Sequence, residues 1–203
     1  SGFLPRLVKE GFKGPIYCSE GTRRLCEILL PDAAKLQVED AQYANKTKHS
    51  KHHPALPLFD EHDAAAALKL FEPQPCDEWF SLAPDIHVHL SRAGHILGST
   101  FVQLRLENHD FNHLITFSGD LGHDRSNIIK GPVKILETDS LVLEATYGDR
   151  RQPRTPPQKA LEHIINKVIG RGGTLIIPAF AVGRTQEVVF LVKQLEEQGL
   201  IPK

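Results

Sequence analysis

The 203-residue sequence contains no methionine, one tryptophan and only three cysteines. Without a methionine, Ser1 is not expected to be a natural start, and we expect the chain to be an internal part of a longer protein. Cys18, Cys26 and Cys76 are odd in number and have no Cys-x-x-Cys spacing, which argues against a disulfide framework and for a reducing compartment. No apolar run approaches the length of a membrane span, and no basic-then-apolar leader is present. We therefore expect a cytoplasmic location and no membrane partner.

The sequence also lacks an excess of either charge. It has 24 Lys and Arg against 25 Asp and Glu, a formal net charge of −1 and a pI near 6.8. This excludes a global positive field, so any affinity for nucleic acid must come from local patches. The most basic stretch, Lys46–His53, is rich in histidine but has no regular ligand spacing and no carboxylate or thiolate. We interpret it as a solvated loop rather than a metal site, with a weak contact to an RNA backbone left open.

Apolar periodicity predicts alternating helices and strands, which is typical of layered α/β architecture. Asp60 is the expected cap of one helix, and Pro31 is expected to start another in its first turn. The expected helices are residues 2–10, 20–30, 31–44, 60–71, 158–170 and 183–197, and the expected strands are 15–18, 85–90, 100–107, 110–117, 142–144 and 174–178, with a further strand beginning at Ile201.

Two glycine-containing loops each present a residue that can bind a metal ion. His95 lies in Ser91–Thr100, and Asp120 lies in Phe117–Gly122. Their glycines allow a positive φ and a close approach of the backbone to an ion. A histidine in such a turn is more often an ordinary loop residue. However, the two strand-like runs between the loops can bring His95 and Asp120 to the same end of a sheet, which favours a metal site.

The chain also contains a single His-x-His, formed by His87 and His89 in a predicted strand. Alternation places both imidazoles on one face of that strand. No Asp-His follows, and the strand leads directly into the His95 loop, so we interpret both as partly exposed strand histidines.

Four stretches resemble the β-CASP branch of the metallo-β-lactamase fold, the nucleic-acid-processing zinc hydrolases that include the mRNA 3′-end cleavage nuclease. These are Ala93–Ser99, Phe117–Gly122, Leu141–Arg150 and Ile177–Glu187. The resemblance implies an α/β fold in which residues 1–150 belong to a metallo-β-lactamase αββα sandwich, truncated at both ends, and residues 151–203 open the inserted β-CASP domain. It also implies a longer protein, because the family needs roughly twice this length and its His-x-His-x-Asp-His motif is absent here.

The resemblance assigns catalytic and metal-binding roles to two residues and a supporting role to a third. His95 would bind one zinc and Asp120 would bridge two, so that a shared hydroxide attacks phosphorus. Glu144 would orient a histidine that is not in this chain. Ala145 departs from the serine that many relatives have at this position, and the departure leaves Glu144 intact.

Two arginines are candidate substrate contacts. Arg150 belongs to a basic cluster with Arg151 and Arg154 in a proline-rich linker, where contact with substrate phosphates and simple solvation are both consistent with the sequence. Arg184 stands at the expected start of a helix, where it can hold a phosphate or pair with acids across a domain interface.

The implied function is that of a zinc-dependent RNA phosphodiesterase, an endo- or 5′-exoribonuclease with two zincs in the complete enzyme. RNA is the implied partner, with single-stranded DNA as an alternative and a homodimer of the full-length protein left open. Two other functions remain: a non-catalytic nucleic-acid-binding relative, and a small-molecule hydrolase of the same fold, against which residues 141–150 and 177–187 argue. Because a catalytic zinc usually has three protein ligands, we expect the isolated chain to bind zinc weakly or not at all and to leave RNA uncut.

Overall fold

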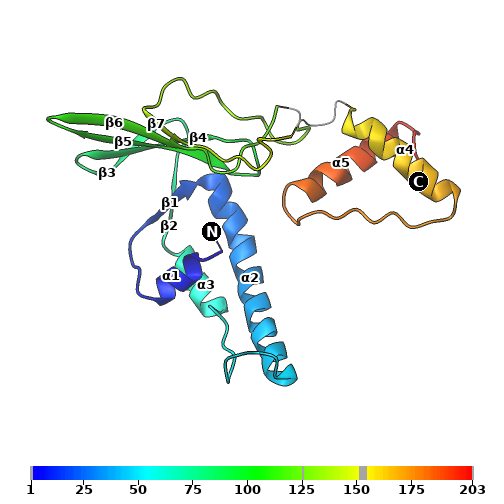
Figure 1. Cartoon of the computed structure of the whole chain (residues 1–203), viewed down its shortest axis with the longest axis horizontal. Coiled ribbons are helices and arrows are strands. Elements are labelled where there is room, and N and C mark those ends of the chain that lie inside the picture. The colour runs from blue at the N-terminus through cyan, green and yellow to red at the C-terminus, as the bar shows by residue number, and fades with distance from the viewer. Residues whose placement is uncertain (1, 125, 151–154, 203) are drawn as a thin grey trace.

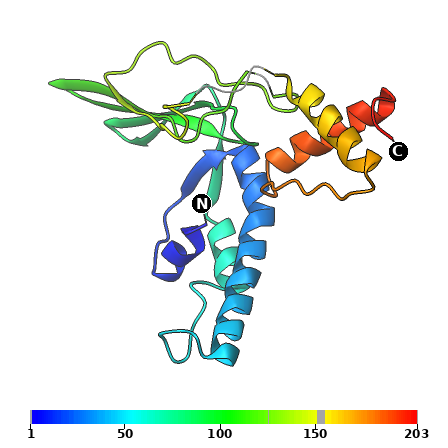
Figure 2. The ribbon, with the colours of Figure 1, turned by 45° about the vertical axis from the view of Figure 1, so that its right-hand side comes forward.

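The computed structural model describes residues 2–124, 126–150 and 155–202. It has a mixed α/β architecture, with a twisted sheet lying across the end of a long helix, two short helices beside that helix, and two further helices to one side (Figures 1 and 2). The strands of the described part form a two-stranded sheet, β1-β2, and a five-stranded sheet in the order β3-β4-β5-β6-β7. No helix in the described part is long and apolar enough to cross a membrane.

The N-terminal part contains three helices and the small parallel sheet. Its elements are α1 (Leu4–Lys9), β1 (Ile16–Ser19), α2 (Glu20–Thr47), α3 (Glu61–Leu68) and β2 (Phe71–Gln74). Strand β1 pairs with β2 in parallel, with Ile16 opposite Phe71. The buried core between these elements consists of Cys18, Cys26, Leu30, Ala34, Phe59, Ala64 and Phe71.

Helix α2 runs as one piece through Pro31, so the expectation of two helices with a boundary at Pro31 is wrong. Proline has no N–H to donate to the carbonyl four residues earlier, which weakens a helix interior. Leu30 before it and Ala34 after it are both buried in the same core, and this packing holds the helix together across the proline. With 28 residues, α2 is about 42 Å long.

Helix α3 is capped by Asp60, as predicted. The Asp60 carboxylate accepts a hydrogen bond from the Asp63 N–H (3.0 Å), and the Asp63 carboxylate accepts one from the Asp60 N–H (3.1 Å). The helix ends at Leu68, three residues before the predicted end, because Phe71 begins β2 and buries its ring in the core.

The larger sheet carries the two glycine-containing loops at one end. Its strands are β3 (Trp79–Ala83), β4 (Ile86–Arg92), β5 (Thr100–Asn108), β6 (Phe111–Phe117) and β7 (Ser140–Val142). All neighbours are antiparallel except β6 and β7. The hairpin of β5 and β6 turns at His109 and Asp110, as predicted.

Two features of this sheet differ from the sequence prediction. Strand β3 was not predicted, and β7 covers 140–142 instead of 142–144. The apolar residues of 142–144 predict a buried strand, and this is also wrong: Leu141 and Val142 are each 54% exposed, because β7 is an edge strand that pairs only with β6 in the described part of the chain.

The histidines of the His-x-His sequence lie on one face of β4 and are partly exposed, as expected. His87 contacts the Ser81 hydroxyl at 2.8 Å and the Glu107 carboxylate at 3.3 Å. The ring of His89 packs on the indole of Trp79, with the centroids 5.0 Å apart.

Helices α4 (Pro157–Gly170) and α5 (Arg184–Glu197) occur where the sequence predicts them. They share a second small core of Ile165, Leu195 and Ile201. Residues 174–178 form no strand, and Ile201 packs against the two helices instead of starting one. A strand needs a hydrogen-bonded neighbour, and none lies beside residues 174–178 in the described part of the chain.

Candidate metal centre

The loop between β4 and β5, residues 93–99, presents His95 to solvent and is closed by Ser99. The Ser99 hydroxyl accepts hydrogen bonds from the backbone N–H groups of His95 (2.9 Å) and Ile96 (3.2 Å) and donates one to the Ile96 carbonyl (2.9 Å). The Ala93 N–H donates to the Ser99 carbonyl at 2.9 Å. Backbone groups that strand pairing leaves free are thus satisfied inside the loop.

The loop after β6, residues 118–122, carries Asp120 to the same end of the sheet. The Gly122 N–H donates to the Ala93 carbonyl at 3.0 Å, which joins the two loops. As a result, His95 Nε2 lies 3.9 Å from Asp120 Oδ2, with the two side chains 43% and 76% exposed. The structure therefore brings these two residues together at one rim of the sheet.

Backbone lies directly against backbone where the loops meet. A Cβ built on Gly122 would overlap the Gly94 carbonyl, and one built on Gly94 would lie 2.7 Å from the carbonyl carbon of Gly131. Gly94 also has a φ of +68°, which disfavours any other residue. Arg92 fixes the third segment, because its Nε donates to the Gly131 carbonyl at 2.9 Å. Only glycine allows these three segments to stack so closely.

The start of α2 holds the other end of the His95 loop. The hydroxyls of Ser19 and Thr22 both donate to the Gly98 carbonyl, at 2.7 and 2.9 Å. Ser19 is also the cap of α2, because its Oγ accepts from the Thr22 N–H at 3.1 Å. Gly98 has a φ of +81°, and a Cβ there would overlap the Thr22 nitrogen. We call this set of contacts the Gly98 clamp.

Glu144 fastens the Asp120 loop from the other side. Its Oε1 accepts a hydrogen bond from the Leu121 N–H and its Oε2 accepts one from the Thr146 N–H, both at 3.0 Å. The Thr146 hydroxyl, followed by these backbone donors, lowers the pKa of Glu144 from 4.5 to about 2. The Glu144 N–H in turn donates to the Ser118 hydroxyl at 3.0 Å. Glu144 is therefore an ionised residue that joins the Asp120 loop to the turn after β7.

The donor set formed by His95 and Asp120 suits zinc. His95 Nδ1 lies 3.3 Å from the Leu121 carbonyl, and a proton assigned to Nδ1 leaves the Nε2 lone pair facing Asp120. Two ligands of a tetrahedral zinc, each about 2.1 Å from the metal, lie roughly 3.4 Å apart, which is close to the observed 3.9 Å. Within the described residues, no third His, Cys, Asp or Glu places its ligand atom within 4.8 Å of both.

Comparison with family models gives no match. The chain is 34% identical over 206 residues to the transcription termination factor FttA of Lokiarchaeum, covering 100% of the chain and 30% of that protein. It is 33% identical to FttA of Methanosarcina mazei with the same coverage. It is 32% identical over 192 residues to ribonuclease TTHA0252 of Thermus thermophilus, covering 94% of the chain and 39% of the ribonuclease.

The chain is a member of the β-CASP family of the metallo-β-lactamase fold. These similarities run through the whole chain and include both loops of the candidate centre. The chain spans about a third of the length of these relatives: 30% of the FttA proteins and 39% of the ribonuclease.

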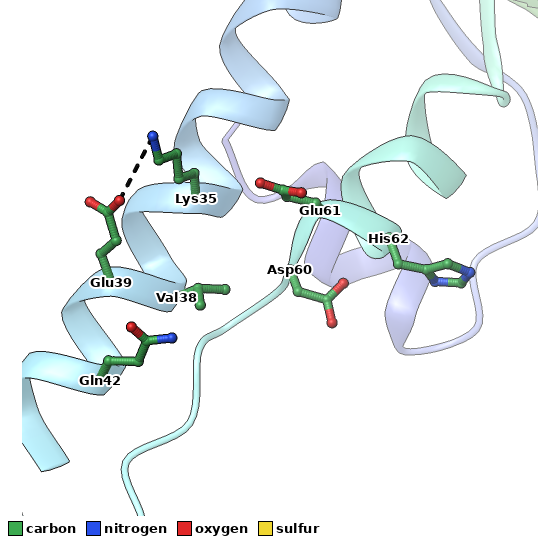
Figure 3. Close-up of a pocket in the computed structure, with 7 residues that line it drawn as sticks. All are labelled: Lys35, Val38, Glu39, Gln42, Asp60, Glu61 and His62. Carbon is green, nitrogen blue, oxygen red and sulfur yellow. Dashed lines mark ion pairs between the residues drawn. The ribbon is translucent and has the colours of Figure 1, made fainter.

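A second group of potential ligands in the β-CASP chain lies at the start of α3. Asp60, His62 and Asp63 each place one ligand atom within 4.8 Å of the others. Asp60 and His62 also line an open hollow of about 440 Å³ between α2 and α3, where the His62 ring points away from α2 (Figure 3).

The contacts of this second group explain it without a metal. Asp60 and Asp63 cap each other's backbone, and Lys9 Nζ lies 2.7 Å from Asp63 Oδ2. The Lys9 ammonium lowers the pKa of Asp63 and stands where a cation would bind. We therefore assign this group to helix capping.

The two candidate substrate arginines have different surroundings. Arg150 is exposed and pairs with the neighbouring Asp149 at 3.3 Å, while Arg151 and Arg154 of the same cluster lie outside the described residues. Arg184 is the exposed first residue of α5, and it has no ion pair with the described residues. A Cβ built on Gly183 would lie 3.2 Å from the Ile96 side chain, so the start of α5 adjoins the His95 loop.

The residues that hold the two loops in place could not be identified from the sequence. Ser99 and Ser118 lie within the recognised stretches, but their hydroxyl contacts have no sequence signature. The spacing of Ser19 and Thr22 gives an ordinary helix-capping signal. Nothing local to them indicates the contact with Gly98, 76 or more positions away.

Proposed function

We propose that this chain is part of a zinc-dependent RNA phosphodiesterase in which His95 and Asp120 bind the metal. One observation carries the proposal: His95 Nε2 faces Asp120 Oδ2 at 3.9 Å, while His95 Nδ1 faces a backbone carbonyl. Support also comes from the relatives, which are named as transcription termination factors and a ribonuclease.

We also propose a division into two domains. Residues 1–150 would be part of the αββα sandwich of the metallo-β-lactamase fold, and residues 151–203 would be the first part of the β-CASP domain. The separate apolar cores, one between α2, α3 and β2 and the other between α4 and α5, support this division.

Zinc bound at this centre would stabilise charge on phosphate oxygens and supply an activated water nucleophile at neutral pH. The chain's own residues have simpler tasks. The backbone carbonyl of Leu121 orients the His95 ring, and Glu144 fixes the Asp120 loop through the Leu121 N–H. The exposure of both proposed ligands leaves the centre open to a polymeric substrate.

Arg184 and Arg150 are the proposed phosphate contacts. The start of α5 adjoins the His95 loop, and guanidinium groups bind phosphate through paired hydrogen bonds. Arg184 has no ion pair within the described part of the chain, so its charge remains available for a substrate. Arg150 would have to exchange its contact with Asp149 for one with the substrate.

The full-length protein provides the test. His95→Ala and Asp120→Ala should each abolish RNA cleavage, with circular dichroism unchanged because both side chains are exposed at the rim. His109→Ala and Asp110→Ala are matched controls in the exposed hairpin turn and should cleave normally. Normal turnover by either rim variant would refute the assignment.

The isolated 203-residue chain should bind zinc weakly or not at all and should leave RNA uncut. The described part supplies two ligands at the centre, and a catalytic zinc usually has three from the protein. Metal analysis after dialysis measures this directly. Two tightly held zincs per chain would contradict the expectation.

The incomplete ligand set favours one alternative, a non-catalytic protein that binds nucleic acid. It differs from the first proposal in a single measurement: the full-length protein would bind RNA and cut none at any zinc concentration. Cleavage that disappears with a chelator and returns with zinc would exclude it.

A further inference from the structure

We propose that the basic tip, defined as Lys46–His53 at the end of α2, binds the phosphate backbone of single-stranded RNA at a distance from the candidate metal centre. The choice of RNA rests on the function proposed above. The tip carries three lysines and three histidines, all exposed, and the chain has no acidic residue from Lys46 to Phe59. Its six basic residues are Lys46, Lys48, His49, Lys51, His52 and His53.

The charge of the tip is not neutralised within the described part of the chain. The ion pairs found along α2 lie closer to its start and middle, such as Arg24 with Glu20 and Lys35 with Glu39. None involves Lys46, Lys48 or Lys51. Although the whole chain has a net charge of −1, this end presents a concentrated positive field.

The basic tip is also held in shape before any ligand binds. The side-chain amide of Asn45 forms two hydrogen bonds with the backbone of Ala55: Nδ2 donates to the carbonyl at 2.9 Å, and Oδ1 accepts from the N–H at 2.8 Å. This closes the loop around the basic residues. The Thr47 hydroxyl adds a bond to the Tyr43 carbonyl at 2.8 Å. Part of the entropy cost of ordering a binding loop is therefore met in the free protein.

An aromatic side chain lies among these cations. Tyr43 is 64% exposed, and its ring packs beside that of His49, with the centroids 5.8 Å apart. Proteins that bind single-stranded nucleic acid combine cations that track the backbone with aromatic rings on which bases stack. Imidazole N–H groups can also donate to phosphate oxygens. The tip and the adjoining Tyr43 together supply all three elements.

Helix α2 connects the tip to the candidate centre. The Gly98 clamp fixes its first turn to the His95 loop, and the tip begins in its last turn and continues into the loop after it (Figure 1). The span is about 42 Å, which corresponds to at most on the order of twelve nucleotides, because the phosphates of an extended single strand lie further apart than the 3.4 Å of a duplex strand. An extended anionic polymer of this length can contact both ends, and the exposed Tyr43 ring beside the basic residues offers a surface on which a base can stack. These two features favour RNA over an acidic protein surface or a membrane.

The test compares two triple variants of the chain that lose the same charge. Lys46, Lys48 and Lys51 are replaced by glutamine in the first, and the exposed Lys13, Lys69 and Lys159 in the second. Fluorescence anisotropy measures binding of an oligouridylate about 24 nucleotides long, twice the estimated span. The buffer contains EDTA, so the result does not depend on the metal centre.

We expect the tip variant to bind RNA about tenfold more weakly at low salt. The slope of the logarithm of the binding constant against the logarithm of the salt concentration should also become shallower by about 2, because each lost phosphate contact removes about 0.7 from it. The control variant should stay within about twofold of the original chain. A third variant, Asn45→Leu, keeps all six basic groups and loses both bonds to Ala55, so it should bind more weakly with an unchanged salt slope.

Equal binding by the two triple variants would overturn the proposal. So would binding of vesicles rich in phosphatidylserine that depends on Lys46, Lys48 and Lys51 when RNA binding does not, because the tip would then be a membrane contact. Either result leaves the proposed cleavage function standing, since that is tested by His95→Ala and Asp120→Ala. Conversely, His95→Ala and Asp120→Ala should leave RNA binding in EDTA unchanged.

Discussion

At the scale of single residues, the candidate centre is shaped by groups that would never contact a metal. Two hydroxyls, those of Ser19 and Thr22, converge on the carbonyl of Gly98. A third, that of Ser99, holds the N–H of His95 itself. The position of the imidazole therefore depends on small polar side chains that surround it.

Thr22→Val tests the Gly98 clamp. Valine keeps the shape and the helix preference of threonine but removes the hydroxyl that donates to the Gly98 carbonyl at 2.9 Å. We expect the free energy of unfolding to fall by about 1 kcal/mol and the amides of residues 95–99 to exchange faster with deuterium.

Two further variants show whether the lost hydroxyl is responsible. Thr22→Ser restores the donor and should restore the slow exchange. Thr47→Val removes a hydroxyl at the far end of the same helix and should leave exchange in the His95 loop unchanged. If Thr22→Val left that exchange unchanged as well, the clamp would not position the loop.

Glu144 provides a prediction about pH. Its pKa falls from 4.5 in the ordinary state to about 2 in the fold, so its contribution to stability is complete above pH 4.5 and is lost as the pH falls towards 2. In Glu144→Gln, a neutral amide replaces the carboxylate whose two oxygens accept hydrogen bonds from the Leu121 and Thr146 N–H groups. The variant should therefore be less stable than the original chain at neutral pH. The difference in urea-unfolding free energy should shrink between pH 4.5 and 2, and a constant difference across that range would contradict the assignment.

At the scale of elements, the sequence predicted the helices and the hairpin whose ends are marked by residues within the same stretch of chain. The cap of α3, the helices α4 and α5 and the hairpin of β5 and β6 were predicted from capping residues, periodicity and a polar turn. Elements that depend on distant partners were not. Strand β2 exists because Phe71 pairs with Ile16, and the run at 174–178 has no neighbouring strand to pair with.

Pro31 offers a test at this scale. Because it lies inside α2 and has no N–H, Pro31→Ala should restore a helical hydrogen bond. We expect the free energy of unfolding to rise by about 1 to 3 kcal/mol, measured by chemical denaturation. Pro57→Ala, in the loop after the basic tip, restores no helical bond and should give no such rise. A loss of stability in Pro31→Ala would show that the proline is needed where it stands.

At the scale of the whole molecule, the candidate centre could be predicted only in part. His95 and Asp120 were predicted to meet because each lies in a recognisable loop and a hairpin connects the two. The clamp from α2 was not, because its hydroxyls lie 76 and 79 positions from Gly98 and belong to a different layer. Packing between layers leaves no pattern within a short stretch of sequence.

The packing of the whole chain also predicts the reactivity of its thiols. Cys18 and Cys26 are buried in the N-terminal core and Cys76 is exposed. Burial raises the pKa of Cys18 to about 11, which further reduces its reactive thiolate. A maleimide added to the native chain should therefore label Cys76 alone, and the other two thiols only after denaturation. Mass spectrometry of the labelled peptides measures this, and native labelling of Cys18 would contradict the buried core.

The backbone contacts at Gly94, Gly98 and Gly122 restrict which substitutions these positions can accept. A side chain at Gly94 would push the His95 loop away from Gly131, one at Gly98 would push it away from the start of α2, and one at Gly122 would push it away from the Asp120 loop. Between them, Leu97 is 57% exposed. In a library that replaces each loop position by every amino acid, variants that keep this arrangement would vary freely at Leu97 and keep one amino acid at each glycine.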